Sequence, residues 1–473
     1  MSSISALNSL LGSSNSINLS EILEAATGAS TPGIDVNSAV SAAVTAAEAP
    51  ETNWESQQTT LQNQSSALAS LQSDATNLDN DMQALNSLTG PLAAATVTSS
   101  NSSVVTGSAA AGSAAGNNVV VVNSLATIAS YSSSAVASAT SDLPAGETVT
   151  ITPADGTPTT ITTGSGVDTL TDLKNAINTA GLGVTASIIT DASGSRLAIT
   201  SNTSGSAGSF AITSSGGSLG FTVGNTGSNA SLTVNGISVS SASNTVTGAL
   251  PGVTLNLQSA SPGTQVSVDV APDTSQASSA INQFVTDYNT LITAVNAQYS
   301  DTGSGEGVLS DDPTVENLQN TLLQELDYTA SPASGSTTTT VPNLSALGIT
   351  VNTDGTLSVD QSTLNGALQN NFSDVQNFFQ GSALNGFANS LDQQLTNFTS
   401  PADGAFTVDL QSIGTENTAL QTDITNFQNN VISPLQTQLK AEYSSAEIAL
   451  QQLPAEIKNV DAELGENNSS SNG

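Results

Sequence analysis

Apolar side chains recur every seven residues in the first part of the chain. One series of positions runs Trp54, Leu61, Leu68, Ala75 and Met82, and a second, three residues on, runs Gln57, Gln64, Leu71, Leu78 and Leu85. This is the a/d pattern of a coiled coil, and it predicts one long helix between Pro50 and Gly90-Pro91. The segment contains no Lys or Arg, so salt bridges between flanking positions cannot form within it. The helix should therefore need a packing partner.

A matching pattern lies near the other end of the chain. Its first part comprises Leu410, Ile413, Leu420, Ile424, Phe427 and Val431. After Pro434 the frame shifts to Tyr443, Leu450, Ile457 and Leu464, with Ala446, Leu453 and Val460 three residues on. Pro434 and Pro454 should kink this helix or mark short breaks. We expect the two terminal helices to pair with each other and with neighbouring subunits; the alternative is two independent helices, each packed on its own domain.

Between these helices the period changes. Short β-branched runs separated by Gly, Ser, Asn and Asp predict a strand-rich region over about residues 96–270, interrupted by a helix at Leu170–Thr179. Helical periodicity returns over 274–399, with Asp354-Gly355 as a hairpin turn. The fold class is therefore α+β and multidomain, with terminal helices forming a coiled-coil leg, a helical domain and an inserted β-rich head. The expected units are residues 1–31 (disordered export segment), 32–95 (N-terminal coiled-coil helix), 96–272 (head), 273–400 (helical domain with a hairpin) and 401–473 (C-terminal coiled-coil helix).

Composition excludes several functions. The chain has no His and no Cys, which removes imidazole and thiolate chemistry. Its only basic residues are Lys174, Arg196, Lys440 and Lys458, and its formal net charge is −35, so nucleic acid and anionic membrane surfaces are not expected partners. No apolar run approaches the length of a membrane span. A composition typical of extracellular proteins, without a recognisable signal peptide, suggests a specialised export route.

Motifs that resemble reactive or ligand-binding sites have simpler interpretations. Asn352–Gly355 resembles part of a calcium loop, but the first and last ligand positions, Thr350 and Gln361, are not carboxylates. Gly303, Gly305 and Gly307 lack phosphate-loop spacing. Asp311-Asp312 precedes a proline and predicts a helix cap rather than a catalytic pair. We therefore expect no enzyme activity, no metal site and no cofactor.

Ordered stretches of the chain resemble the bacterial flagellar filament cap proteins, the flagellar hook-associated protein 2 family. The stretches are Pro32–Ser38 with Ala47–Pro50, Thr169–Ser187 with Arg196–Ser201 (similar to the flagellar hook IN motif), Ser231–Leu257 with Asp273–Ala297, and Leu347–Asp360. The resemblance implies a secreted, extracellular protein at the distal tip of the flagellum, exported by the flagellar type III route. It also implies a ring-shaped homo-oligomer that promotes folding and polymerisation of flagellin and prevents its leakage.

The implied partners are flagellin, hook–filament junction proteins, an export chaperone in the cytoplasm and other copies of the chain. The residues expected to bind partners are the apolar heptad positions, which would bury their area only on assembly: Leu61, Leu68, Leu71, Leu78, Leu85, Leu420, Ile424, Phe427, Leu450, Leu453 and Ile457. Two other classes stay open at this point. A surface adhesin would suit the Ser/Thr-rich middle, and a hook–filament junction protein would share the terminal helices.

Overall fold

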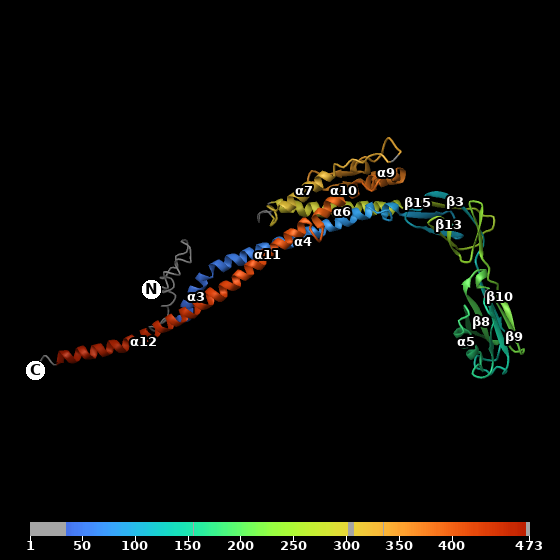
Figure 1. The fold of residues 1–473 in the computed structure, drawn as a ribbon, viewed down its shortest axis with the longest axis horizontal. Coiled ribbons are helices and arrows are strands. Elements are labelled where there is room, and N and C mark those ends of the chain that lie inside the picture. The colour runs from blue at the N-terminus through green and yellow to red at the C-terminus, as the bar shows by residue number, and fades with distance from the viewer. Residues whose placement is uncertain (1–34, 155, 301–306, 334, 470–473) are drawn as a thin grey trace.

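The chain forms an elongated molecule with strands at one end and helices along the rest of its length (Figure 1). The structure is a computed structural model, and it describes residues 35–154, 156–300, 307–333 and 335–469. The predicted α+β, multidomain fold class is confirmed. The proposed export segment, residues 1–31, lies outside the described residues, as do Gly303 and Gly305.

Two helices open the described chain, α3 (Val36–Ala47) and α4 (Ala49–Asn86). Asp35 caps α3, because its side chain accepts hydrogen bonds from the backbone amides of Asn37 and Ser38. The hydrogen bond from the Ser38 side chain, followed by those from the backbone, lowers the pKa of Asp35. Pro50 occupies the first turn of α4, where its missing amide hydrogen costs nothing. The predicted long helix is thus present and is 38 residues long.

The C-terminal helices are α11 (Ala405–Phe427) and α12 (Ser433–Ser469), joined by the π-helical turn η4 (Gln428–Ile432). A proline ring collides with the carbonyl four residues before it. For Pro434 that carbonyl lies within the wider π-turn η4. Pro434 therefore coincides with a local change in the helix, as predicted. The break expected at Pro454 is wrong, because α12 is one helix through that position. The carbonyl that loses its donor belongs to Leu450, a residue that is 41% exposed.

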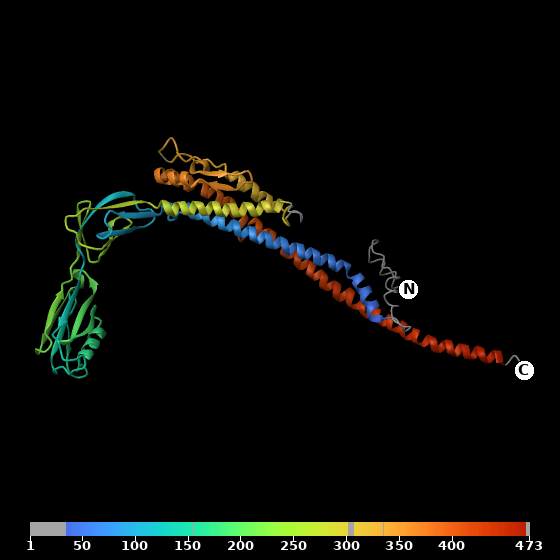
Figure 2. The same cartoon turned by 180° about the vertical axis from the view of Figure 1, so that it is seen from behind.

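The two terminal regions lie side by side and run antiparallel (Figures 1 and 2). Helix α11 packs on α4, and α12 packs on α3. The predicted pairing of the two ends is therefore present within one chain.

A helical body surrounds the C-terminal half of α4. Its further elements are α6 (Thr274–Tyr299), α7 (Pro313–Glu325), η3 (Leu344–Leu347), β16 (Ile349–Val351), β17 (Leu357–Val359), α8 (Gln361–Asn370), α9 (Phe372–Gln380) and α10 (Phe387–Thr399). Phe284, Phe378 and Phe387 are fully buried at its centre, with ring centroids 5.4 Å apart for Phe378 and Phe387. Most of the chain's few aromatic rings are thus concentrated in one core.

The strand-rich region, inserted between α4 and α6, contains two separate hydrophobic cores. The first is enclosed by a five-stranded sheet of order β1-β15-β3-β11-β12 and a three-stranded sheet of order β13-β14-β2. Its strands are β1 (Ala95–Ser99), β2 (Val105–Ala109), β3 (Gly116–Ser124), β11 (Ala230–Val234), β12 (Ile237–Ser241), β13 (Thr245–Leu250), β14 (Val253–Leu257) and β15 (Val266–Pro272). Val120, Leu232 and Leu255 are completely buried in it.

The second β unit is inserted between β3 and β11 of the first. Its elements are β4 (Ile128–Ser133), β5 (Thr148–Pro153), β6 (Thr159–Thr162), α5 (Leu170–Thr179), β7 (Val184–Asp191), β8 (Gly194–Ser204), β9 (Phe210–Ser215) and β10 (Phe221–Asn225). They form sheets of order β10-β4-β8-β7 and β6-β5-β9. Helix α5 starts with a capping box between Thr169 and Asp172 and buries Leu170, Leu173 and Ile177. This nesting places the second β unit farthest from α12 along the molecule (Figure 1).

Candidate assembly surface

The paired terminal helices meet along a seam that is apolar near its junction with η4 and lined by polar side chains farther along. Near the junction of α11 and η4, Trp54 on α4 packs edge to face on Phe427, with 5.5 Å between ring centroids. One turn earlier on α4, Glu51 is 9% exposed and accepts a hydrogen bond from the Gln428 amide. This part of the seam is closed by contacts within one chain.

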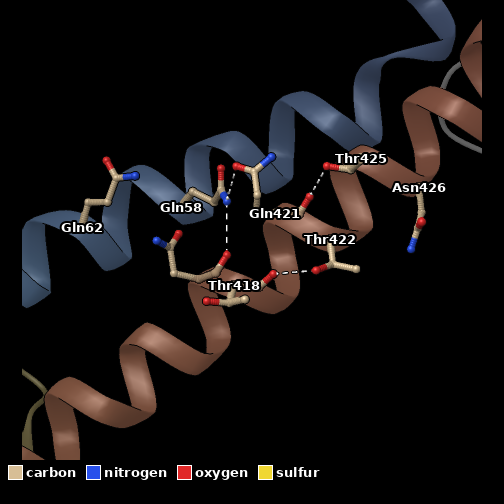
Figure 3. Close-up of a pocket in the computed structure, with 8 residues that line it drawn as sticks. Gln58, Gln62, Thr418, Gln421, Thr422, Thr425 and Asn426 are labelled. Atoms are coloured by element: carbon tan, nitrogen blue, oxygen red, sulfur yellow. Dashed lines mark hydrogen bonds between the residues drawn. The ribbon is translucent and has the colours of Figure 1, made fainter.

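Farther along α4 the seam becomes polar. A hollow of about 390 Å³ lies between α4 and α11 and is lined by amides and hydroxyls, among them Gln58, Gln62 and Thr422 (Figure 3). Gln58 Nε2 donates to the Asn417 carbonyl at 3.3 Å and to Gln421 Oε1 at 3.4 Å. On this side of the helix pair the contact between α4 and α11 consists of a few long hydrogen bonds.

The structure divides the eleven predicted partner-binding residues into three groups. Leu68, Leu71, Leu78 and Leu85 are at most 2% exposed, because α6, α10 and their neighbours in the same chain cover them. The expectation that these four bury their area only on assembly is therefore wrong. A heptad pattern predicts a helix face that packs against another helix, but it does not predict whether that helix belongs to the same chain.

The second group lies in the seam between α4 and α11. Ile424 is 8% exposed, while Leu61, Leu420 and Phe427 are half-buried. Their burial is also supplied within the chain, although incompletely. Of the two Gln residues at predicted heptad core positions, Gln57 is exposed, and Gln64 donates to the Val308 carbonyl at 3.2 Å.

The third group is exposed on α12. Leu435, Leu439 and Tyr443 pack on a small core formed with Val40 and Val44 of α3. The same face of α12 continues as Leu450, Leu453 and Ile457, which are 41%, 48% and 54% exposed. Helix α12 extends past the start of α3 (Figures 1 and 2), so none of the described elements covers these residues. We call Leu450, Leu453 and Ile457 the exposed stripe.

One further exposed apolar residue on α12 was missed by the heptad analysis. Ile448 is 58% exposed and lies outside both heptad series. A two-residue step turns an α-helix by about 200°, which places Ile448 on the side opposite Leu450. Ile448 is therefore an apolar residue on the side of α12 opposite the exposed stripe, and heptad periodicity does not predict it.

Within the described residues, no group of three or more acidic side chains is arranged to hold a metal ion. At the hairpin, Asp354 accepts hydrogen bonds from the backbone and hydroxyl of Thr356, as in a turn. Asp312 caps α7 through the amides of Thr314 and Val315, which confirms the capping interpretation. Among the described helices, none is long and apolar enough to cross a membrane.

These observations define a class of protein by its architecture: an elongated molecule whose paired terminal helices carry a helical body and two nested β units. Comparison with known families agrees. Models of the flagellar hook-associated protein 2 N-terminus and C-terminus match residues 32–129 and 227–455, and the flagellin hook IN motif matches 148–203. The chain belongs to the flagellar hook-associated protein 2 family, the flagellar cap proteins.

Individual relatives show the extent of the similarity. The B-type flagellar hook-associated protein 2 of Pseudomonas aeruginosa is 30% identical over 310 residues, which are 59% of this chain and 64% of the relative. The A-type protein of that species is 31% identical over 170 residues, 34% of each chain. The matches thus span less than two thirds of these relatives. The crystal structure of the flagellar cap protein FliD D1-D2-D3 domains from Escherichia coli is similar with a TM-score of 0.57 and 28% identity, covering 74% of this chain and 99% of that one.

Proposed function

We propose that this protein caps the distal tip of the bacterial flagellar filament. In this proposal several copies form a ring, and the ring promotes the folding and polymerisation of exported flagellin and prevents flagellin from leaking into the medium. The chain acts as a scaffold without catalysis, and it reaches the tip through the flagellar type III export route. The resemblance of its sequence and fold to flagellar cap proteins supports this assignment.

The exposed stripe is the single observation that carries the docking part of the proposal. Most apolar heptad residues are covered within the chain, whereas Leu450, Leu453 and Ile457 continue a packed face into solvent. Covering a Leu or Ile side chain stabilises an assembly by about 1.5–3 kcal/mol when burial is complete. We therefore assign the stripe to contacts with the filament tip, with junction proteins or with other copies of the chain.

The β units lie at the opposite end of the molecule from α12 (Figure 2). With α12 docked at the filament, the β units are placed away from the docking contact, where neighbouring copies can form a plate over emerging flagellin. An export chaperone would hold the chain in the cytoplasm before export. Such a chaperone could reach the helix face formed by Leu68, Leu71, Leu78 and Leu85 only before the helical body forms, because this face is buried afterwards.

A gene deletion tests the proposed function. We expect deleted cells to carry hooks without filaments and to release monomeric flagellin into the medium, and we expect this chain, expressed from a plasmid, to reverse both effects. Flagellin in the medium is measured by immunoblotting beside a cytoplasmic marker that controls for lysis. Normal filaments combined with lost surface attachment would instead support an adhesin.

A further inference from the structure

Two pairs of carboxyl groups meet across the helix interfaces of the body. Asp79 and Asp81 both lie on α4, two residues apart, so they point in different directions. The Asp79 carboxyl group faces that of Asp392 on α10, within reach of a hydrogen bond if one of the two carries a proton. The Asp81 carboxyl group faces that of Asp287 on α6 in the same way. Each pair thus joins α4 to a different neighbouring helix.

Several carboxylate oxygens of these pairs are buried without a donor, although Gln283 donates to Asp287 Oδ2 at 3.0 Å. Asp79 is only 8% exposed, and Gln83 donates to its Oδ2 at 3.1 Å. Among the described residues, nothing donates to the buried atoms Asp79 Oδ1, Asp392 Oδ1 and Asp81 Oδ2. A buried acceptor without a donor is costly, whereas one proton placed between two carboxyl groups satisfies both.

No cationic side chain is available to neutralise these groups. The sequence contains no Lys, Arg or His between residues 1 and 173 or between 197 and 439, and these ranges supply every helix of the body. The other titratable groups that act on this region are also acidic. Asp74 on α4 interacts with Asp287, and Asp409 on α11 interacts with Asp312 at the start of α7. The charge on each pair must therefore be neutralised from solution.

We propose that each pair, Asp79 with Asp392 and Asp81 with Asp287, shares one proton, and that these protons make the α4–α6–α10 body a pH-sensitive joint. The joint is held together in mildly acidic solution and loosens as the pH rises and both members of a pair ionise. A proton fits these sites better than a calcium ion, which takes six to eight oxygen ligands, because no cluster of three acidic side chains is present in the described residues. This inference does not depend on the proposed function.

The expected direction of the pH effect follows from the folded and unfolded states. Burial, followed by the hydrogen bond and the charge of the partner, raises the pKa of Asp79 and of Asp81 to about 7. In the unfolded chain an aspartate has a pKa of about 3.9. Between about pH 4 and 7 the folded body holds protons that the unfolded chain does not hold, so the stability of the body falls as pH rises through this window. Most aspartates that accept hydrogen bonds have a lowered pKa, so their contribution to stability is lost as pH falls.

The test compares thermal unfolding of the full chain, followed by helical circular dichroism, at about pH 5.5 and about pH 8. We expect the helical midpoint to be about 4–8 °C higher at the lower pH. The variant carrying Asp79→Asn and Asp81→Asn should lose most of this difference, because an amide donates to the partner carboxylate at every pH. The control carrying Glu416→Gln and Asp423→Asn removes two exposed charges from α11 and should keep the difference.

The reciprocal variant, Asp287→Asn with Asp392→Asn, repeats the test from the other side of each pair if the first variant fails to fold. Equal pH dependence in the wild type and in a folded pair variant would overturn the proposal. So would a rise in the midpoint on adding calcium ions at about pH 8 that is present in the wild type and absent in the pair variant, because the pairs would then bind a cation.

Discussion

The indole ring of Trp54 on α4 packs edge to face on the Phe427 ring at the end of α11, with planes 87° apart. These residues lie far apart in the sequence, and their contact joins the N-terminal and C-terminal helices where α11 gives way to η4. Glu51 and Gln428 form a hydrogen bond beside them. The leg is thus closed at this point by contacts within one chain.

A double-mutant cycle on Trp54 and Phe427 should show direct coupling. We expect Trp54→Ala and Phe427→Ala each to destabilise the leg, with a coupling energy of about 0.5–1.5 kcal/mol. Helical circular dichroism during denaturant unfolding measures all four proteins of the cycle. Additive effects of the two substitutions would contradict the contact. Because Trp54 is the only tryptophan, its emission in Phe427→Ala should also shift to the red as the indole meets water.

Buried and exposed heptad residues should behave differently. Leu71→Ala and Leu78→Ala should each lower the free energy of unfolding of the helical body by about 2–5 kcal/mol, because they create cavities in a core covered by α6 and α10. Leu450→Ala on the exposed stripe should change it by no more than about 0.5 kcal/mol. Denaturant titrations of the purified chains measure both effects. A similar cost at Leu450 and Leu78 would show that the stripe is covered in the free protein.

The Asp360 cap predicts a pH effect opposite in sign to that of the buried pairs. Hydrogen bonds from the side chains and then the backbones of Ser362 and Thr363 lower the pKa of Asp360 to about 2. A pKa below the unfolded value contributes stability above about pH 4, and the contribution is lost as pH falls toward 2. Asp360→Ala should therefore be less stable than the wild type at neutral pH, and Asp360→Asn, which can still cap, should lie closer to the wild type. Unfolding midpoints measured from about pH 6 down to about pH 2 should converge for Asp360→Ala and the wild type; a constant gap would contradict the assignment.

Glu147 should be a stability determinant of the second β unit. It is 3% exposed, and its carboxylate accepts hydrogen bonds from the Ser218 backbone amide at 2.6 Å and from the Ser218 hydroxyl. Glu147→Ala leaves the Ser218 donors without a partner and should cost about 1–3 kcal/mol. Glu147→Gln, which can still accept one hydrogen bond, should cost less. Proteolysis of this unit, followed by mass spectrometry, should be faster in Glu147→Ala than in Glu147→Gln; equal rates would show that the carboxylate is dispensable.

Periodicity predicted the long terminal helices well, because heptad spacing is a local property of the sequence. The β-branched runs also predicted the strand-rich region, which contains strands rich in Val and Ile such as β3, β7 and β14. Strands β2, β4 and β12 are harder to predict, since their Ser, Gly and Ala residues resemble those of loops and they gain strand structure from their neighbours in the sheet. The division of the head into two nested units depends on which strands pair, and local patterns do not encode that.

The candidate site was harder to predict than the fold. The same spacing marks Leu71, which the chain covers itself, and Leu453, which it leaves exposed. The difference arises from α6 and α10, which return to α4 from far along the sequence. The acid pairs formed by Asp79 and Asp81 were also invisible to sequence analysis, since their partners come from separate helices.

Complementation of a cap-deficient strain tests the central claim most directly. The strain receives the wild type, a triple variant (Leu450→Asp, Leu453→Asp and Ile457→Asp) or the control Ile448→Asp, which places the same charge on the opposite side of α12. Electron microscopy then scores filaments, and immunoblotting confirms equal export. We predict that the wild type and Ile448→Asp restore filaments and that the triple variant leaves bare hooks with flagellin in the medium. Bare hooks with the wild type would contradict capping by this chain, and full-length filaments with the triple variant would contradict docking through the exposed stripe.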